Sequence, residues 1–292
     1  MKCTRHHSQH MYHASAYSVS AEFERPKKHS MAPQASVVLA GHGGHGSSRA
    51  SAYNVDGLIS FKNAYSEVGG SFDDCHGMHT THAWSVVEGL NVADMLTADR
   101  VVARMAVYHE PTGGSEATYD ITGSYFENLR IAGHPVELEL ATHVFHDHDT
   151  YPKLAKAHKA GKTDDWLVGS KLMQLKNDEL TDLEDKYHAL IGMSEVVKEW
   201  KSPKRPTDRG SYWFSPANNL EWKPSSEILG FGSIICIPKF GVIRLAEMVV
   251  HRHSRTLRMF RVQMCSSGHG TSDGGTTTGG GTGGGTYPTP PG

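Results

Sequence analysis

The residues Val87-Glu88-Gly89-Leu90 form a short phrase that occurs three times between positions 47 and 140. Each copy has an apolar residue, an acid, Gly or Asn, and then Leu; the others are Val55-Asp56-Gly57-Leu58 and Phe126-Glu127-Asn128-Leu129. Gly and Asn tolerate a positive φ, and an alternating apolar segment follows each copy. The phrase therefore predicts a bend between two strands, three times over.

The segments around the phrase alternate apolar and polar residues with the period of a β-strand. The clearest strand is expected over residues 99–108, with one face formed by Val101, Ala103, Met105 and Val107. Further strands are expected over residues 14–23, 34–40, 81–87, 136–144, 233–238, 241–250 and 256–264. Strands with one apolar and one polar face, at short spacings, predict a mainly β fold, an antiparallel β-sandwich-like domain.

The composition divides the chain into four parts. Residues 1–150 are expected to form the first part of the β domain, and residues 151–230 a helical and Pro-rich insertion with a helix over 178–200. Residues 231–265 are expected to add a three-stranded meander that closes the domain. Residues 266–292 are mostly Gly, Thr and Pro, which predicts a flexible low-complexity tail.

The overall charge and hydropathy exclude several classes of protein. The chain has 292 residues and a net charge of −2, which gives no electrostatic footprint for nucleic acid. No apolar run is long enough for a transmembrane helix, so no membrane span is expected. No apolar leader is visible at the N-terminus, which is consistent with a cytoplasmic protein or with an export signal that was removed.

Four cysteines and twenty histidines are the chain's metal-binding and redox candidates. Cys3, Cys75, Cys236 and Cys265 allow three disulfide pairings and leave the compartment open, although Cys236 is expected to be a buried thiol. Two histidine groups could bind Cu or Zn if their loops converge, namely His76, His79 and His82 with His146 and His148. In a strand, His79 and His82 would face opposite sides, whereas His146 and His148 would project together.

No motif of an enzyme nucleophile survives inspection. The one Gly-x-Ser-x-Gly spacing, Gly270–Gly274, falls in the Gly- and Thr-rich segment expected to be a flexible tail, without the strand and helix patterns of a nucleophile turn. His-Glu-x-x-His and paired CxxC units are absent from the sequence. The glycine-rich stretch over 41–48 is followed by no helical pattern and no suitable Lys, so a phosphate loop is not favoured. A non-catalytic protein is therefore favoured over an enzyme. A carbohydrate-binding module using Tyr212, Trp213 and Trp222 is a further alternative.

One family resemblance is carried by Val87-Glu88-Gly89-Leu90-Asn91-Val92, by Leu96-Thr97-Ala98-Asp99-Arg100-Val101-Val102-Ala103 and by similar short segments at 126–133, 241–247 and 257–262. These segments resemble bacterial surface and secreted proteins of the choice-of-anchor type, especially the choice-of-anchor P group. The resemblance implies an extracellular β-sandwich of unknown biochemical role and supplies no functional residues. The chain departs from that family in showing no signal peptide or anchor and in carrying the insertion at 151–230.

These observations favour a non-catalytic extracellular or cell-surface structural protein. Self-association as a homo-oligomer or filament is expected through sheet edges and the tail, with a docking edge near Pro238 or Met264. The main alternative is a histidine-rich metal-binding protein or metalloenzyme.

Overall fold

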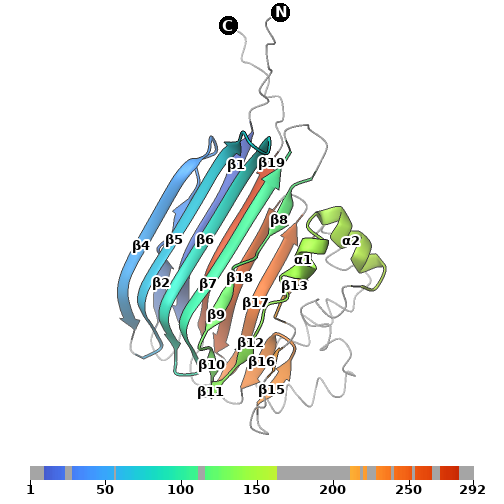
Figure 1. Ribbon diagram of the computed structural model, residues 1–292. Coiled ribbons are helices and arrows are strands. Elements are labelled where there is room, and N and C mark those ends of the chain that lie inside the picture. Colours follow the sequence, from blue (N-terminus) through green and yellow to red (C-terminus); the bar gives the residue numbers. More distant parts are fainter. Residues whose placement is uncertain are drawn as a thin grey trace, which may run out of the picture.

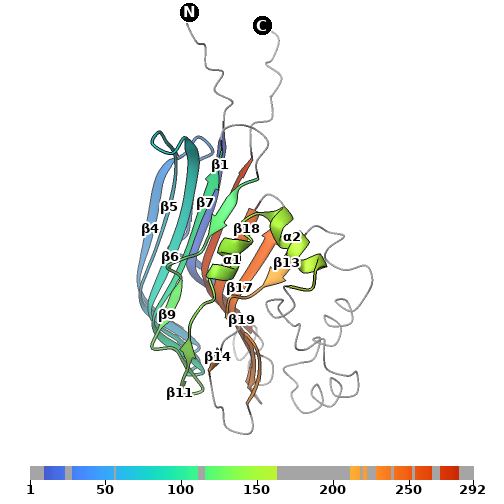
Figure 2. The ribbon, with the colours of Figure 1, turned by 45° about the vertical axis from the view of Figure 1, so that its right-hand side comes forward.

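The structure is a computed structural model, and it describes residues 10–23, 28–55, 57–110, 116–162, 211–217, 220–221, 228–237, 240–251, 254–264 and 270–282. Within them the fold is mainly antiparallel β, with two large sheets packed face to face, which confirms the sandwich-like prediction (Figures 1 and 2). The helix expected over 178–200 lies outside the described residues.

The first sheet, called the hairpin sheet, is built from consecutive strands of the middle of the chain. Its order is β11-β10-β7-β6-β5-β4, and β8 and β9 also pair with β7. Short turns connect its long strands, so each strand pairs with its neighbour in sequence. The strands are β4 (Gly44–Val55), β5 (Ile59–Asp73), β6 (Met78–Val92), β7 (Leu96–His109), β8 (Thr118–Asp120), β9 (Tyr125–Glu127), β10 (Arg130–Ile131) and β11 (His134–Pro135).

The second sheet, called the terminal sheet, joins the two ends of the chain. Its order is β15-β16-β17-β18-β19-β1-β2, with β13 on β17 and β3 on β1. The expected meander is confirmed, because β16, β17 and β18 are neighbours in order. The strands are β1 (Met11–Phe23), β2 (His29–Gln34), β3 (Val37–Val38), β13 (Ser211–Phe214), β15 (Leu229–Phe231), β16 (Ile234–Ile237), β17 (Gly241–His251), β18 (Ser254–Met264) and β19 (Gly270–Thr282).

The core lies between the two sheets. All four residues expected on one face of β7 are buried in it, at 2% exposure or less. Aromatic and aliphatic side chains of β1, β17 and β18 meet them from the terminal sheet, including Phe23, Leu245 and Phe260. Burial of this apolar surface is the main force that holds the two sheets together.

The repeated phrase does place a residue with positive φ at each predicted position: Gly57 at 71°, Gly89 at 63° and Asn128 at 50°. Gly57 lies in the β4–β5 turn, where Leu58 N donates to Val55 O at 2.7 Å. Gly89 instead lies inside β6, where the pairing with β7 skips from Glu88 to Leu90. The phrase therefore marks a local break in a strand ladder rather than a chain reversal in every copy.

Two short helices lie on the side of the sandwich beside β13 (Figure 2), and a separate two-stranded sheet joins two short segments. Helix α1 (His143–Asp147) buries Phe145 against Phe214, and α2 (Tyr151–Lys159) buries Leu154 and Ala157. The small sheet pairs β12 (Glu137–Leu138) with β14 (Leu220–Glu221). The strand expected over 136–144 is therefore wrong beyond Leu138, because Phe145 reaches the core from a helix.

The structure also corrects the expected domain boundaries. β13 belongs to the terminal sheet, so the insertion expected over 151–230 ends earlier than predicted. The flexible tail expected over 266–292 is wrong for Gly270–Thr282, which forms β19 between β1 and β18. Its sequence has no apolar residue, but backbone pairing on both sides satisfies its N–H and C=O groups.

Candidate functional site

The five histidines considered as metal ligands lie in different places. His76 is in the β5–β6 turn, where its Nδ1 lies 2.7 Å from Asp73 Oδ2. That hydrogen bond is the main reason why the pKa of Asp73 is below its usual value. His146 lies in α1 and His148 follows it as the C-cap residue, so the expectation that both project from one strand is wrong.

His79 and His82 are three residues apart in β6 and take part in separate clusters. The His82 Nε2 and His45 Nε2 atoms lie 3.7 and 3.0 Å from the same oxygen, Glu67 Oε1. His79 belongs instead to a group at the start of β1. Within the described residues, no group of three or more His, Cys, Asp and Glu side chains is arranged to hold a metal ion.

The group at the start of β1, called the histidine cluster, contains His10, Tyr12, His79 and His109. The rings of His10 and His79 stack with centroids 4.0 Å apart, and His109 lies 5.1 Å from His10. Tyr12 Oη and His79 Nδ1 are 2.8 Å apart, which joins the terminal sheet to the hairpin sheet. Burial, followed by repulsion from His79 and His109, lowers the pKa of His10 to about 4.

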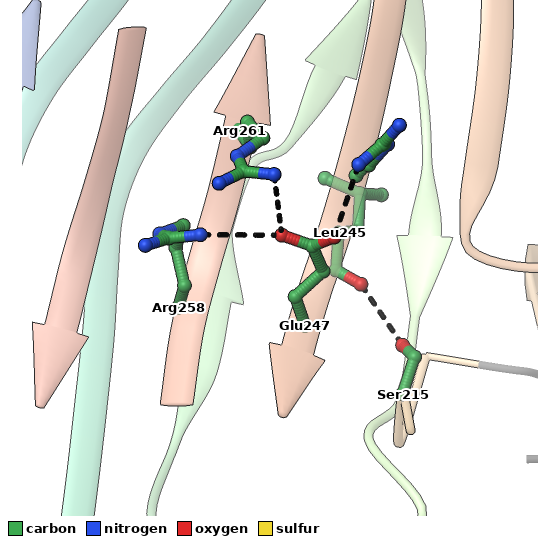
Figure 3. A network of polar contacts seen from close by, with 6 residues as sticks. Ser215, Leu245, Glu247, Arg258 and Arg261 are labelled. Carbon is green, nitrogen blue, oxygen red and sulfur yellow. Dashed lines mark hydrogen bonds and ion pairs between the residues drawn. The ribbon is translucent and has the colours of Figure 1, made fainter. Parts of the chain in front are cut away.

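A second polar group lies on the terminal sheet and is called the Glu247 network (Figure 3). Glu247 accepts from Arg244 Nη1 at 3.4 Å and from Arg258 Nη1 at 3.5 Å, while Arg261 Nη1 lies 3.7 Å away. The adjacent residue Met248 belongs to the core, so strand alternation places Glu247 on the face turned away from the hairpin sheet. Leu245 also belongs to the core, because the positive φ of Ala246, 50°, breaks the alternation between Leu245 and Glu247. The carboxylate is nevertheless buried.

The sequence contains a signal for this network in β17. Arg244 and Glu247 interrupt an otherwise apolar run from Val242 to Val250, where a charge must find a partner. The register supplies that partner, because Arg244 pairs with Arg261 and Glu247 with Arg258 across β17 and β18.

A groove of about 560 Å³ lies beside the network. Its walls come from β1, β2 and β18, and its polar lining includes Ser20, Glu22, Ser30, Arg261 and Gln263. β19 is the strand that lies between β1 and β18. Both signs of charge face the groove, so its chemistry selects no single class of ligand.

The sheet edges form the third candidate. The terminal sheet ends in β15, which has three residues, and in β2, which contains Pro33 and a register shift against β1. One edge of the hairpin sheet is β11, which has two residues and includes Pro135. Its other edge is β4, which has twelve residues, no proline and one formal charge, Arg49.

Short strands, proline and irregular pairing are the usual means by which proteins protect a sheet edge. β4 uses none of them, and within the described residues it pairs only with β5. The docking edge expected near Pro238 or Met264 is wrong, because β16 and β18 both lie inside the terminal sheet. β4 could not be recognised as an edge from the sequence, which shows strands but not their order.

The aromatic residues considered for carbohydrate binding do not form an open platform in the described part of the chain. Tyr212 is 6% exposed, and the rings of Tyr151, His158 and Phe214 surround it. Burial raises the pKa of Tyr212 to about 12. Trp213 lies in β13 in register with Val249, and Trp222 lies outside the described residues.

A family model described as Domain of unknown function (DUF8256) matches residues 10–251, and the chain belongs to that family. No curated protein and no solved structure matches the chain. Among the described helices, none has the length and apolar character needed to cross a membrane.

Proposed function

We propose that this member of the DUF8256 family is a non-catalytic structural protein that assembles with copies of itself outside the cell or at its surface. One observation carries the proposal: within the described residues β4 is a long and regular sheet edge that no other segment covers, whereas the other edges are short or interrupted by proline. An edge of this kind is a template for pairing with another chain.

The surroundings of β4 support assembly rather than protection. Ten of its twelve residues are neither buried nor formally charged, and most are Gly, Ser or Ala, which allow close approach of a second strand. Val38 of β3 is 68% exposed, and its neighbour Val37 lies against Gly46 of β4. An exposed apolar side chain beside a free edge adds apolar area that a partner can cover.

The location outside the cell rests on the resemblance to choice-of-anchor proteins, carried by the phrase at Val87-Glu88-Gly89-Leu90 and the segments around it. Protease treatment of intact source cells tests it, since a surface protein is cut while a cytoplasmic marker survives. A chain that is protected until the cells are lysed would refute the surface location.

The test of self-association is the molar mass of the full chain by sedimentation equilibrium, from micromolar to millimolar concentration. The monomer mass is 31.9 kDa, and the proposal predicts an average mass that rises above it with concentration. A mass that stays at the monomer value throughout this range would refute the proposed function.

A further inference from the structure

In the part of the chain that the structure describes, the edge of β4 opposite β5 offers a continuous set of hydrogen-bonding groups. Its pairing with β5 runs from Gly44 opposite Gly70 to Val55 opposite Ile59. At about 3.4 Å per residue the edge is roughly 40 Å long, and about half of its N–H and C=O groups point away from β5. A partner strand of similar length would satisfy these groups without any change in the sandwich.

Symmetry limits how two copies of β4 can pair. Along an antiparallel ladder, hydrogen-bonded and non-hydrogen-bonded residue pairs alternate. Consecutive residues of one strand belong to different kinds of pair, so a residue cannot lie opposite its sequence neighbour in the second copy. When two identical strands pair about a two-fold axis, the residue at the axis must therefore lie opposite its own copy. The axis therefore passes beside a residue and never between two consecutive residues of the strand.

The length and charge of β4 then select that residue. Overlap is longest when the axis lies near the middle of Gly44–Val55, which leaves Arg49 and Ala50 as centres. A centre at Arg49 places two guanidinium groups directly opposite each other, which destabilises a sheet. A centre at Ala50 places Arg49 opposite Ser51 of the second copy, twice in each dimer.

We propose that the partner of β4 is β4 of a second copy of this chain, paired antiparallel about a two-fold axis at Ala50. This inference rests on the proposed self-association and names its surface, partner and register. It joins two hairpin sheets into one continuous sheet. The two strands can meet along their whole length, because Gly46 has no side chain and those of Ser48, Ala52 and Asn54 are small.

Charge substitutions at Ser51 test the register. Ser51 is exposed, so both variants are expected to fold as the parent does. Ser51→Glu places a carboxylate opposite Arg49 of the second copy and should tighten the dimer about tenfold, while Ser51→Lys should weaken it about tenfold. The matched control is Ser47, on the same face of β4 but opposite Tyr53 of the second copy, where Glu and Lys should have equal, small effects.

A covalent test uses Ala50 itself. In a background in which Cys3, Cys75 and Cys265 are replaced by Ser, Ala50→Cys places two thiols opposite each other at a Cα separation of about 4.5–5.5 Å, within the range of a disulfide. Mild oxidation should give a dimer on a non-reducing gel with Ala50→Cys and none with Ser47→Cys.

The outcomes separate the two proposals. A wild-type protein that is monomeric at all concentrations overturns both. An assembled protein whose dissociation constant responds equally at positions 47 and 51, and which forms no link through Cys at position 50, overturns the β4 pairing and leaves self-association standing. A stronger effect of Ser47→Glu than of Ser51→Glu would overturn the register, since it indicates a centre at Ser48.

Discussion

Replacement of Glu247 by Gln tests how much the buried carboxylate of the Glu247 network contributes to stability. The change keeps the size and shape of the side chain but removes its charge. Arg244, Arg258 and Arg261 then lose the anion that they share on the terminal sheet. Each guanidinium is partly removed from water, so the loss of a buried negative charge beside it lowers the stability of the folded chain.

The expected loss follows from the burial of the four side chains. Glu247 is 5% exposed, and the arginines are 10%, 20% and 29% exposed at Arg244, Arg258 and Arg261. Breaking a fully buried pair costs about 3–5 kcal/mol, and partial solvation of two arginines brings the estimate to the lower end, about 3 kcal/mol. The matched control is Glu88→Gln in the hairpin sheet, where Glu88 and Arg100 are 35% and 33% exposed and the loss should stay below about 1 kcal/mol.

Urea unfolding at neutral pH, followed by tryptophan fluorescence and far-UV circular dichroism, measures both variants. The midpoint should fall by about 1 M for Glu247→Gln, and the slope should stay the same. Equal losses in the two variants would refute the reasoning, because they would show that burial does not set the strength of these ion pairs.

Three further predictions concern the histidine cluster, β17 and β19. The pKa of His10 is about 4 in the folded chain against 6.5 for an ordinary histidine. The contribution of His10 to the free energy of unfolding is therefore constant above pH 6.5 and falls as the pH drops toward 4. The full loss for such a shift is about 3.4 kcal/mol, which solvent around a partly buried ring reduces to roughly 1–2 kcal/mol. Urea midpoints measured against pH should fall less in His10→Phe than in the parent, and an identical pH profile would contradict the assignment. Gly241→Ala should lower the free energy of unfolding by more than about 4 kcal/mol, because the added Cβ would lie 1.9 Å from Gln263 O. In the same urea titration the control Gly57→Ala, whose Cβ would have no atom within 4 Å, should lower it by about 1 kcal/mol. Deletion of residues 266–292 removes β19 and its pairings with β1 and β18, so far-UV circular dichroism and soluble yield should show loss of the native fold; a folded, soluble truncation would contradict the place of β19 in the sheet.

Much of the fold could be predicted from local patterns. Alternation of apolar residues places β1, β7, β17 and β18 close to their observed bounds, since each has one face in the core. The positive φ of Gly57, Gly89 and Asn128 could be predicted as well, because backbone preference depends on the residue itself.

Features that depend on distant partners could not be predicted in this way. The sequence of β19 has no apolar alternation that could predict a strand. Its strand conformation depends on backbone pairing with β1 and β18. Helix α1 is only five residues long, and the even spacing of Leu138, Leu140 and Val144 fits a strand.

For the candidate sites too, the sequence indicates which residues need partners but not which distant residues supply them. The charges in the Glu247 network could be identified as needing partners, but the identity of those partners depends on the β17–β18 register. The histidine groups were predicted from spacing in sequence, yet His79 stacks on His10 and pairs in register with His109 instead of meeting His76 and His82. Spacing alone does not show which strands become neighbours.

The position of β19 between β1 and β18 has a consequence for how the chain folds during synthesis. The hairpin sheet can form as its residues leave the ribosome, since its long strands pair with their sequence neighbours. β1 pairs with β19 across positions such as Tyr12 and Gly281, and at about 5–20 residues per second it emerges roughly 15–50 s earlier than its partner. The terminal sheet therefore closes last during synthesis. The same separation in sequence slows the pairing of β1 with β19 when the full chain refolds, so pulse-labelled hydrogen exchange should show protection in β5 and β6 before protection in β1.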